Sequence, residues 1–209
     1  PYTPETLNRA FGIVGGAALI LGLLGLVGLE PRSDDKPSGE ARYSWRIMIQ
    51  TIWGNPQARL FFFYLLILLA AILGQDILLE PFAAEAFDMT VRETTRITSF
   101  WGVFVLIAIL FTGWLESRFR KRSIATLGGW GALIGFLLIV LSGITINQVI
   151  FYAGVVFLGI GTGISTVSNL SLMLDMTVTG QVGLFIGAWG MANAISRLMG
   201  SVLGGVVRD

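Results

Sequence analysis

The sequence predicts an all-α integral membrane protein, and three observations carry this prediction. Apolar residues make up 54% of the 209 positions, whereas charged residues make up only 13%. The mean hydropathy is strongly positive. The apolar residues also gather in six long runs, and about 20 such residues are enough to cross a hydrocarbon core as a helix. Ordinary soluble domains do not combine these features.

Each of the six runs is predicted to be one membrane-spanning helix. They cover residues 10–29, 60–79, 97–115, 123–143, 148–168 and 182–207. Continuous apolarity, rather than a 3.6-residue amphipathic period, identifies them, because lipid and neighbouring helices are both apolar.

The distribution of basic residues predicts how the spans are oriented. Lys and Arg concentrate in two connections, between the first and second spans and between the third and fourth: Arg32, Lys36, Arg42, Arg46, Arg118, Arg120, Lys121 and Arg122. Loops 30–58 and 116–122 are therefore expected to face the cytoplasm. Both chain ends then fall on the opposite side.

The composition argues against several classes of function. The sequence has no cysteine and no histidine, which removes disulfides, thiol or imidazole catalysis and most metal sites. The formal net charge of +1 provides no basic field for nucleic acid. We expect neither an enzyme nor a nucleic-acid partner.

The segment before Pro56 is predicted to form an interfacial helix on the cytoplasmic surface. A helical arrangement separates an apolar face from a polar one: Trp45, Met48, Ile49 and Ile52 against Arg42, Arg46 and Gln50. The alternative is an irregular loop. The preceding stretch, EPRSDDKPSGEAR, reads as a flexible linker.

Acidic residues lie at the end of the second span. Asp76 and Glu80 are four residues apart, next to Gln75, and share one helix face. Their repulsion predicts that one is protonated, or that a cation or an arginine lies between them. For Glu80, a place in the headgroup layer without a partner is the alternative. Pro81 predicts that the span stops or breaks here.

The sixth span carries a polar stripe. Trp189, Asn193 and Arg197 follow one another at intervals of four. An arginine at the centre of a span costs about 2.5–3.5 kcal/mol on insertion scales, so it needs a counter-charge or water. We predict that Arg197 pairs with Asp76, directly or through water. The alternative is an unpaired Arg197 in a wet cavity.

Several glycines are candidates for close packing between helices. Four glycine pairs have the spacing that lets helix backbones approach closely: Gly12 with Gly16, Gly131 with Gly135, Gly183 with Gly187 and Gly200 with Gly204. The stretch GIGTG, residues 159–163, lies inside a span and is predicted to serve packing rather than nucleotide binding.

For Asp175, a solvated loop position is favoured over a helix cap or a contact with the basic loop.

The loop GWLESRFRKRS, residues 113–123, resembles a cytoplasmic motif of the major facilitator superfamily, Gly-x-Leu-x-Asp-Arg-x-Gly-Arg-Lys. The matching positions are Gly113, Leu115, Arg118, Lys121 and Arg122. Ser117 replaces the motif aspartate, for which Glu116 is a possible substitute, and Arg120 replaces the second glycine. The resemblance implies a superfamily-like helix bundle whose six spans are equivalent to helices 6 to 11 of twelve. Residues 1–29 would end the N-terminal half, 30–58 would be the central linker and 59–209 the C-terminal half, with further helices of the same polypeptide missing.

Within that superfamily, three stretches resemble the PucC-type, or bacteriochlorophyll delivery, family: NPQAR, GQDILLEPFAAEAF and GLFIGAWGMANAISRLMG. This resemblance implies a carrier or assembly factor for chlorophyll or bacteriochlorophyll. Its expected place is a thylakoid or intracytoplasmic photosynthetic membrane, and its expected partners are the lipid bilayer, pigment, and light-harvesting or photosystem subunits.

If a pigment binds, its magnesium would have to be held by an oxygen ligand or a water. The candidate ligands are Gln75, Asp76, Glu80 and Asn193. Candidate macrocycle contacts are Phe82, Trp101, Trp189 and Gly190, although aromatic residues in membrane proteins more often serve packing or anchoring. Two other functions stay open: a proton-coupled solute transporter using Asp76 or Glu80, and a structural subunit of a photosynthetic supercomplex.

Overall fold

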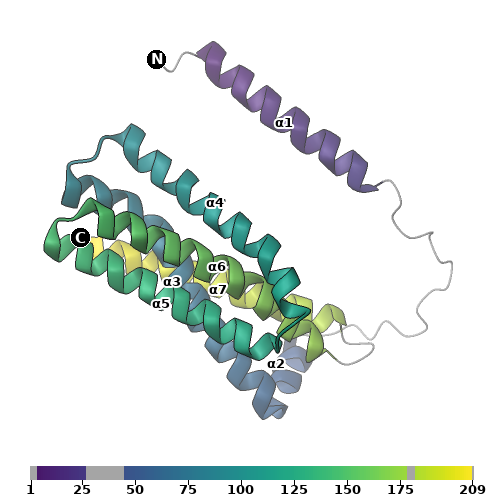
Figure 1. Cartoon of the computed structure of the whole chain (residues 1–209). Coiled ribbons are helices and arrows are strands. Elements are labelled where there is room, and N and C mark those ends of the chain that lie inside the picture. The colour runs from purple at the N-terminus through teal and green to yellow at the C-terminus, as the bar shows by residue number, and fades with distance from the viewer. Residues whose placement is uncertain (1–3, 27–44, 178–181, 209) are drawn as a thin grey trace. The chain divides into compact units, whose positions relative to one another are not determined.

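The computed structural model describes residues 4–26, 45–177 and 182–208, which fall into two units divided after Arg42. The first unit holds helix α1 (Pro4–Leu26). The second holds six helices (Figure 1): α2 (Trp45–Gly54), α3 (Pro56–Phe87), α4 (Val91–Glu116), α5 (Lys121–Thr145), α6 (Gln148–Asp175) and α7 (Val182–Arg208).

The all-α membrane fold is confirmed. Within the described residues, α1, α4, α5 and α6, together with segments of α3 and α7, are long and apolar enough to cross a membrane. Each overlaps one of the predicted spans, so the chain is a multi-pass membrane protein.

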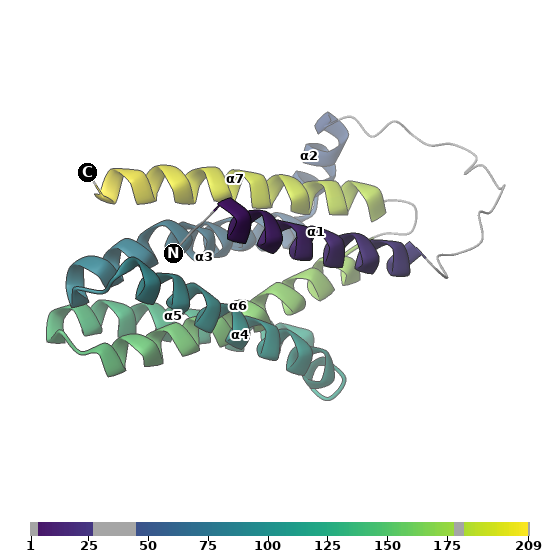
Figure 2. The same cartoon turned by 90° about the horizontal axis from the view of Figure 1, so that it is seen from above.

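Helix α6 organises the second unit. It packs mainly against α5 and α4, while α3 packs mainly against α7. Both views show α6 beside α5 (Figure 1, Figure 2). Half of the α6 span is buried, the largest share among the candidate spans of the described chain.

Glycine explains how α6 approaches two helices so closely. A Cβ atom added to Gly161 would lie 2.7 Å from the carbonyl carbon of Gly131 in α5. On another face of α6, a Cβ at Gly163 would lie 2.5 Å from the carbonyl oxygen of Val105 in α4. A Cβ at Gly159 would lie 2.9 Å from the carbonyl oxygen of Trp101, also in α4. The prediction that GIGTG serves packing is confirmed.

The four glycine pairs divide into two groups. Gly131 with Gly135 faces α6, and Gly200 with Gly204 faces α3, as the spacing predicts. A Cβ at Gly183, Gly187, Gly12 or Gly16 would meet nothing within 4 Å among the described residues. Spacing alone therefore identifies small residues but not which of them face a neighbour.

The predicted stop at Pro81 is wrong. Helix α3 continues through Pro81 and ends at Phe87, where Asp88 caps it in the left-handed conformation with φ of 57°. A proline removes one backbone hydrogen bond, and membrane helices tolerate that loss when neighbouring packing compensates for it. Neighbouring Ala83 is fully buried and Leu79 nearly so, which shows that this part of α3 is packed.

Helix α2 confirms the predicted helix before Pro56. Ile52 is buried in a cluster with residues of α3, α6 and α7, whereas Arg46 and Gln50 are exposed. The side chains of Trp45 and Met48 lie outside the described part, as does Arg42. The apolar face thus packs at least partly on protein, and contact with the membrane surface stays a prediction.

Candidate functional site

An apolar cavity of about 530 Å³ lies between α3, α5 and α7. Its walls include Ala71, Gly74, Gln75 and Phe82 of α3, Val140 of α5 and Leu203 of α7. Among the described residues that line it, Gln75 carries the one polar side chain, and only 6% of Gln75 is exposed. The volume lies in the range of small-molecule sites.

Two close helix contacts shape this cavity. A Cβ on Gly200 would lie 2.8 Å from the backbone nitrogen of Gly74, so α7 and α3 touch through their backbones. At the other end of the cavity, the Phe82 ring covers Gly143 of α5, where a Cβ would lie 2.9 Å from its Cζ. The ring also contacts Phe151 of α6, with centroids 6.0 Å apart. Small residues therefore form one wall, and an aromatic cluster closes one end.

Glu80, predicted on the same helix face as Asp76, does not share the surroundings of Gln75. The carboxylate of Glu80 accepts a hydrogen bond of 2.6 Å from the Thr98 hydroxyl of α4. Glu80 is half-buried rather than free in solvent. The side chain of Asp76 lies outside the described residues. Sequence reasoning missed Thr98, which only the packing of α4 on α3 brings to Glu80.

The polar stripe of α7 is separate from the cavity. The amide nitrogen of Asn193 donates to the carbonyl of Trp189, one turn earlier in the same helix, at 2.9 Å. Arg197 is exposed. Its predicted partner, Asp76, has no described side chain, so this pair stays a prediction.

A charge exchange tests the Asp76–Arg197 pair. Asp76→Asn and Arg197→Gln should each lower the thermal stability, since an unpaired charge within a span costs about 2.5–3.5 kcal/mol. The double variant Asp76→Arg/Arg197→Asp should recover most of the loss, measured by thermal unfolding in detergent. Arg92→Gln, at the exposed start of α4, is the control. Failure of the exchange to restore stability would count against the pair.

The candidate macrocycle contacts lie in different places. Phe82 and Trp101 pack against one buried cluster that contains Phe151. Trp189 packs against another, which contains Phe62 and Phe185. Gly190 is exposed, and a Cβ there would meet nothing within 4 Å among the described residues. Of these four, only Phe82 lines the cavity together with Gln75.

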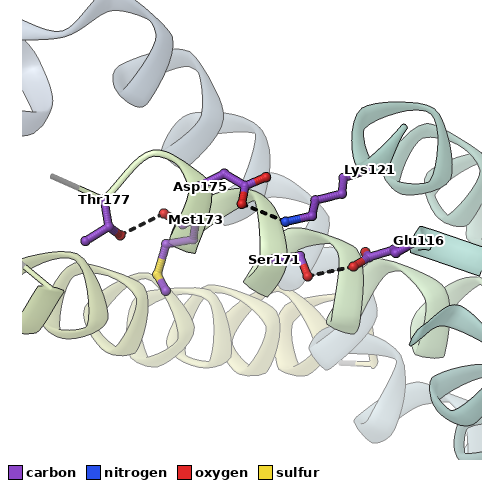
Figure 3. Close-up of polar contacts among 6 residues, drawn as sticks. All are labelled: Glu116, Lys121, Ser171, Met173, Asp175 and Thr177. Atoms are coloured by element: carbon purple, nitrogen blue, oxygen red, sulfur yellow. Dashed lines mark hydrogen bonds and ion pairs between the residues drawn. The ribbon is translucent and has the colours of Figure 1, made fainter. Parts of the chain in front are cut away.

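The basic loop is fixed to the end of α6 by two polar contacts (Figure 3). Lys121 donates to the carboxylate of Asp175 at 2.6 Å, and the Ser171 hydroxyl donates to Glu116 at 2.7 Å. The expectation of a solvated loop position for Asp175 is therefore wrong. Asp175 is the last residue of α6, and the packing of α5 on α6 brings Lys121 within reach.

The remaining motif residues lie around these contacts. Gly113 is exposed, Leu115 packs on the cluster of Ala108, Ile124 and Ile164, and Arg122 is exposed. The Arg118 guanidinium lies 6.0 Å from the Trp114 ring centroid, at the limit of a cation–π contact. Sequence reasoning missed Ser171. Its position one turn before Asp175 was the available signal, because residues four apart share a helix face.

The Lys121–Asp175 pair should contribute little stability. The side chains are 36% and 52% exposed, and exposed pairs typically contribute about 0.2–1 kcal/mol. In a double-mutant cycle with Lys121→Gln and Asp175→Asn, we expect a coupling energy in that range that shrinks as salt is added. The neighbouring Arg122→Gln is the control. A coupling energy above about 2 kcal/mol would show that the contact is more desolvated than this geometry indicates.

Comparison with known families decides the classification. The family model described as "PUCC protein" matches residues 1–209. The chain belongs to the PUCC family.

Three curated relatives show how far the similarity extends. The chain is 29% identical over its whole length to "Bacteriochlorophyll synthase 44.5 kDa chain" of Rhodobacter capsulatus, covering 50% of that protein. It is 29% identical over its whole length to "Protein PucC" of Cereibacter sphaeroides, covering 46% of it. It is 34% identical to "Protein PucC" of Rhodovulum sulfidophilum over 64% of this chain and 30% of that one.

The chain therefore spans about half the length of the curated relatives that it matches over its whole length. No solved structure matches it. The family assignment rests on sequence, and the membrane helix bundle rests on the fold described above.

Proposed function

We propose that this PUCC protein is a non-enzymatic carrier or assembly factor. It would hold a chlorophyll or bacteriochlorophyll and hand it to light-harvesting or photosystem polypeptides in a photosynthetic membrane. Membership of the PUCC family supports a role connected with such pigments, because one relative is named as a chain of a bacteriochlorophyll synthase.

The observation that carries the proposal is the cavity between α3, α5 and α7. Its lining is apolar, and Gln75 offers one amide that can donate to or accept from a bound molecule. Among the described lining residues there is no acid, base or nucleophile. The site is therefore suited to holding an apolar molecule rather than to reacting with it.

A pigment offers two parts for such a site, a flat magnesium macrocycle and a long hydrocarbon tail. The chemistry of the lining fits the tail and a neighbouring carbonyl group. In a bound pigment, the macrocycle would be the part that absorbs light. Gln75 would orient the pigment, and Phe82 would contact an edge of the ring.

Purification from native membranes tests the proposal. The full-length protein, tagged and isolated from photosynthetic membranes in mild detergent, should carry pigment that is visible in its absorption spectrum, antenna or photosystem polypeptides, or both. An unrelated multi-pass protein with the same tag, isolated from the same membranes, is the control. Absence of both pigment and polypeptides would contradict the proposal, and solute uptake driven by a pH gradient would then favour a transporter.

A further inference from the structure

The exposed face of α4 carries an open apolar hollow close to the end of the helix. It is lined by Leu110, Phe111 and Trp114 and has a volume of about 360 Å³, and we call it the α4 hollow. The three side chains are 71%, 65% and 59% exposed. Trp114 and Leu110 lie about 3 and 9 Å along the helix from its last residue, Glu116. Because α4 and α5 are both candidate spans, the short turn between them lies at one membrane surface, and the hollow lies next to it.

An arginine lies at the surface end of the α4 hollow. The guanidinium carbon of Arg118 is 6.0 Å from the centroid of the Trp114 ring, and Arg118 is exposed. The apolar wall and the positive charge therefore adjoin each other through this ring. A ligand that contacts both needs an apolar chain that ends in an anionic group. A guanidinium binds phosphate oxygens through two parallel hydrogen bonds.

The positive charge of this turn is only partly neutralised within the described chain. Lys121 is paired with Asp175, and Glu116 accepts a hydrogen bond from Ser171 (Figure 3). The other basic residues of the turn form no ion pair with a described residue: Arg118, Arg120 and Arg122. Basic residues beside a membrane span attract anionic lipids. The charge beside the α4 hollow is thus complementary to an anionic lipid headgroup.

We propose that the α4 hollow binds one anionic phospholipid. Arg118 would hold the phosphate at the membrane surface, and an acyl chain would lie over Trp114 and Leu110. Tryptophan favours the headgroup level of a bilayer, which is the depth that this arrangement gives to Trp114. The lipid site is separate from the cavity between α3, α5 and α7, and it does not depend on the proposed function.

Other occupants match only one part of this arrangement. A free phosphate ion would bind Arg118 but would leave the apolar side chains of the hollow uncovered. A purely apolar transmembrane helix would cover the hollow but would leave the guanidinium without an anion. A phospholipid supplies both groups, and the bilayer itself places its phosphate at the depth where a spanning helix ends.

Competition between two lipids tests the headgroup contact. The full-length protein in mild detergent is offered equal amounts of phosphatidylglycerol and phosphatidylcholine with identical acyl chains, and native mass spectrometry counts the bound molecules. The wild type should prefer phosphatidylglycerol. Arg118→Gln should lower this preference about fivefold, the usual contribution of one basic residue near an anionic surface.

Arg92→Gln is the matched control for the lost charge. Arg92 is exposed and lies on the same helix, at its opposite end, where Glu93 interacts electrostatically with Arg96. This substitution should leave the preference for phosphatidylglycerol unchanged. Both arginines are exposed, so neither substitution disturbs the core, and thermal unfolding of each variant checks this.

Brominated acyl chains test the apolar contact. One equivalent of phosphatidylglycerol with brominated chains, which quench nearby tryptophan fluorescence, is added to the same full-length protein. Part of the wild-type fluorescence should be quenched. Trp114→Phe keeps an aromatic wall and should remove the quenched part. Trp130→Phe should retain it, because Trp130 is 61% exposed on α5 but does not line the α4 hollow.

Three results would overturn the lipid site. An unchanged lipid preference in Arg118→Gln would remove the headgroup contact. Quenching that survives in Trp114→Phe would place the acyl chain elsewhere on the protein. Absence of both the preference and the quenching in the folded wild type would show that protein, rather than lipid, covers this face of α4 in the full-length chain.

Discussion

The Gly161→Ala variant is expected to lose several kcal/mol of stability, or not to assemble the bundle. The added Cβ would lie 2.7 Å from the carbonyl carbon of Gly131 and 2.8 Å from the carbonyl oxygen of Gly128. Both are backbone atoms of α5, so the helices must separate to admit it. Overpacking typically costs about 1–3 kcal/mol, and this contact with backbone belongs at or above the upper end. Thermal unfolding in detergent measures the loss.

A second alanine substitution separates packing from helix propensity. Gly102 lies within α4, and a Cβ there would meet nothing within 4 Å among the described residues. Gly102→Ala should be neutral or stabilising by up to about 1 kcal/mol, since alanine favours the helix. Equal unfolding temperatures for Gly161→Ala and wild type would contradict the close contact of α5 and α6.

The Phe151→Ala variant has the second largest expected effect. Phe151 is fully buried and contacts Phe82, Phe87 and Tyr152, with ring centroids 5.2–6.0 Å apart. Removing such a ring leaves a void that typically costs about 3–5 kcal/mol in soluble cores. We expect about 3 kcal/mol here, because packing rather than transfer from water stabilises helices in lipid. Removing this support also frees the Phe82 ring, so pigment retention should fall.

Phe157 provides the matched control for this variant. It lies on the same helix as Phe151 and is 44% exposed. Phe157→Ala should cost less than about 1 kcal/mol and leave the pigment content unchanged. Similar losses for the two variants in thermal unfolding would show that the aromatic cluster does not hold this end of the bundle.

The spans were predictable because bilayer thickness fixes their length and lipid fixes their apolarity. Five of the predicted runs lie within a helix of the structure, and the described part of the first, residues 10–26, lies within α1. The helix ends were less accessible. Pro81 was expected to end its span, yet α3 runs six residues further to Phe87, because burial of the neighbouring residues compensates for a lost backbone bond.

The polar contacts depended on which helices meet. Asp175 resembled a solvated residue in the sequence, and it pairs with Lys121 only because α5 packs along α6. Glu80 likewise meets Thr98 through the contact of α4 with α3. Local spacing places residues on a helix face, but it does not say which helix that face meets.

The cavity was only partly predictable. Gln75 and Phe82 were singled out from a polar stretch and a family resemblance, and both line it. The α5 and α7 walls, such as Val140 and Leu203, carry no sequence signal because they are ordinary apolar residues of spans. Their role follows from the way Gly74 and Gly200 bring α3 against α7.

A cryo-electron microscopy map of the full-length protein, purified with its pigment from photosynthetic membranes, tests the central claim most directly. The account predicts pigment density between α3, α5 and α7, beside Gln75 and Phe82. A pigment seated elsewhere, with this cavity closed or filled by another part of the polypeptide, would contradict it.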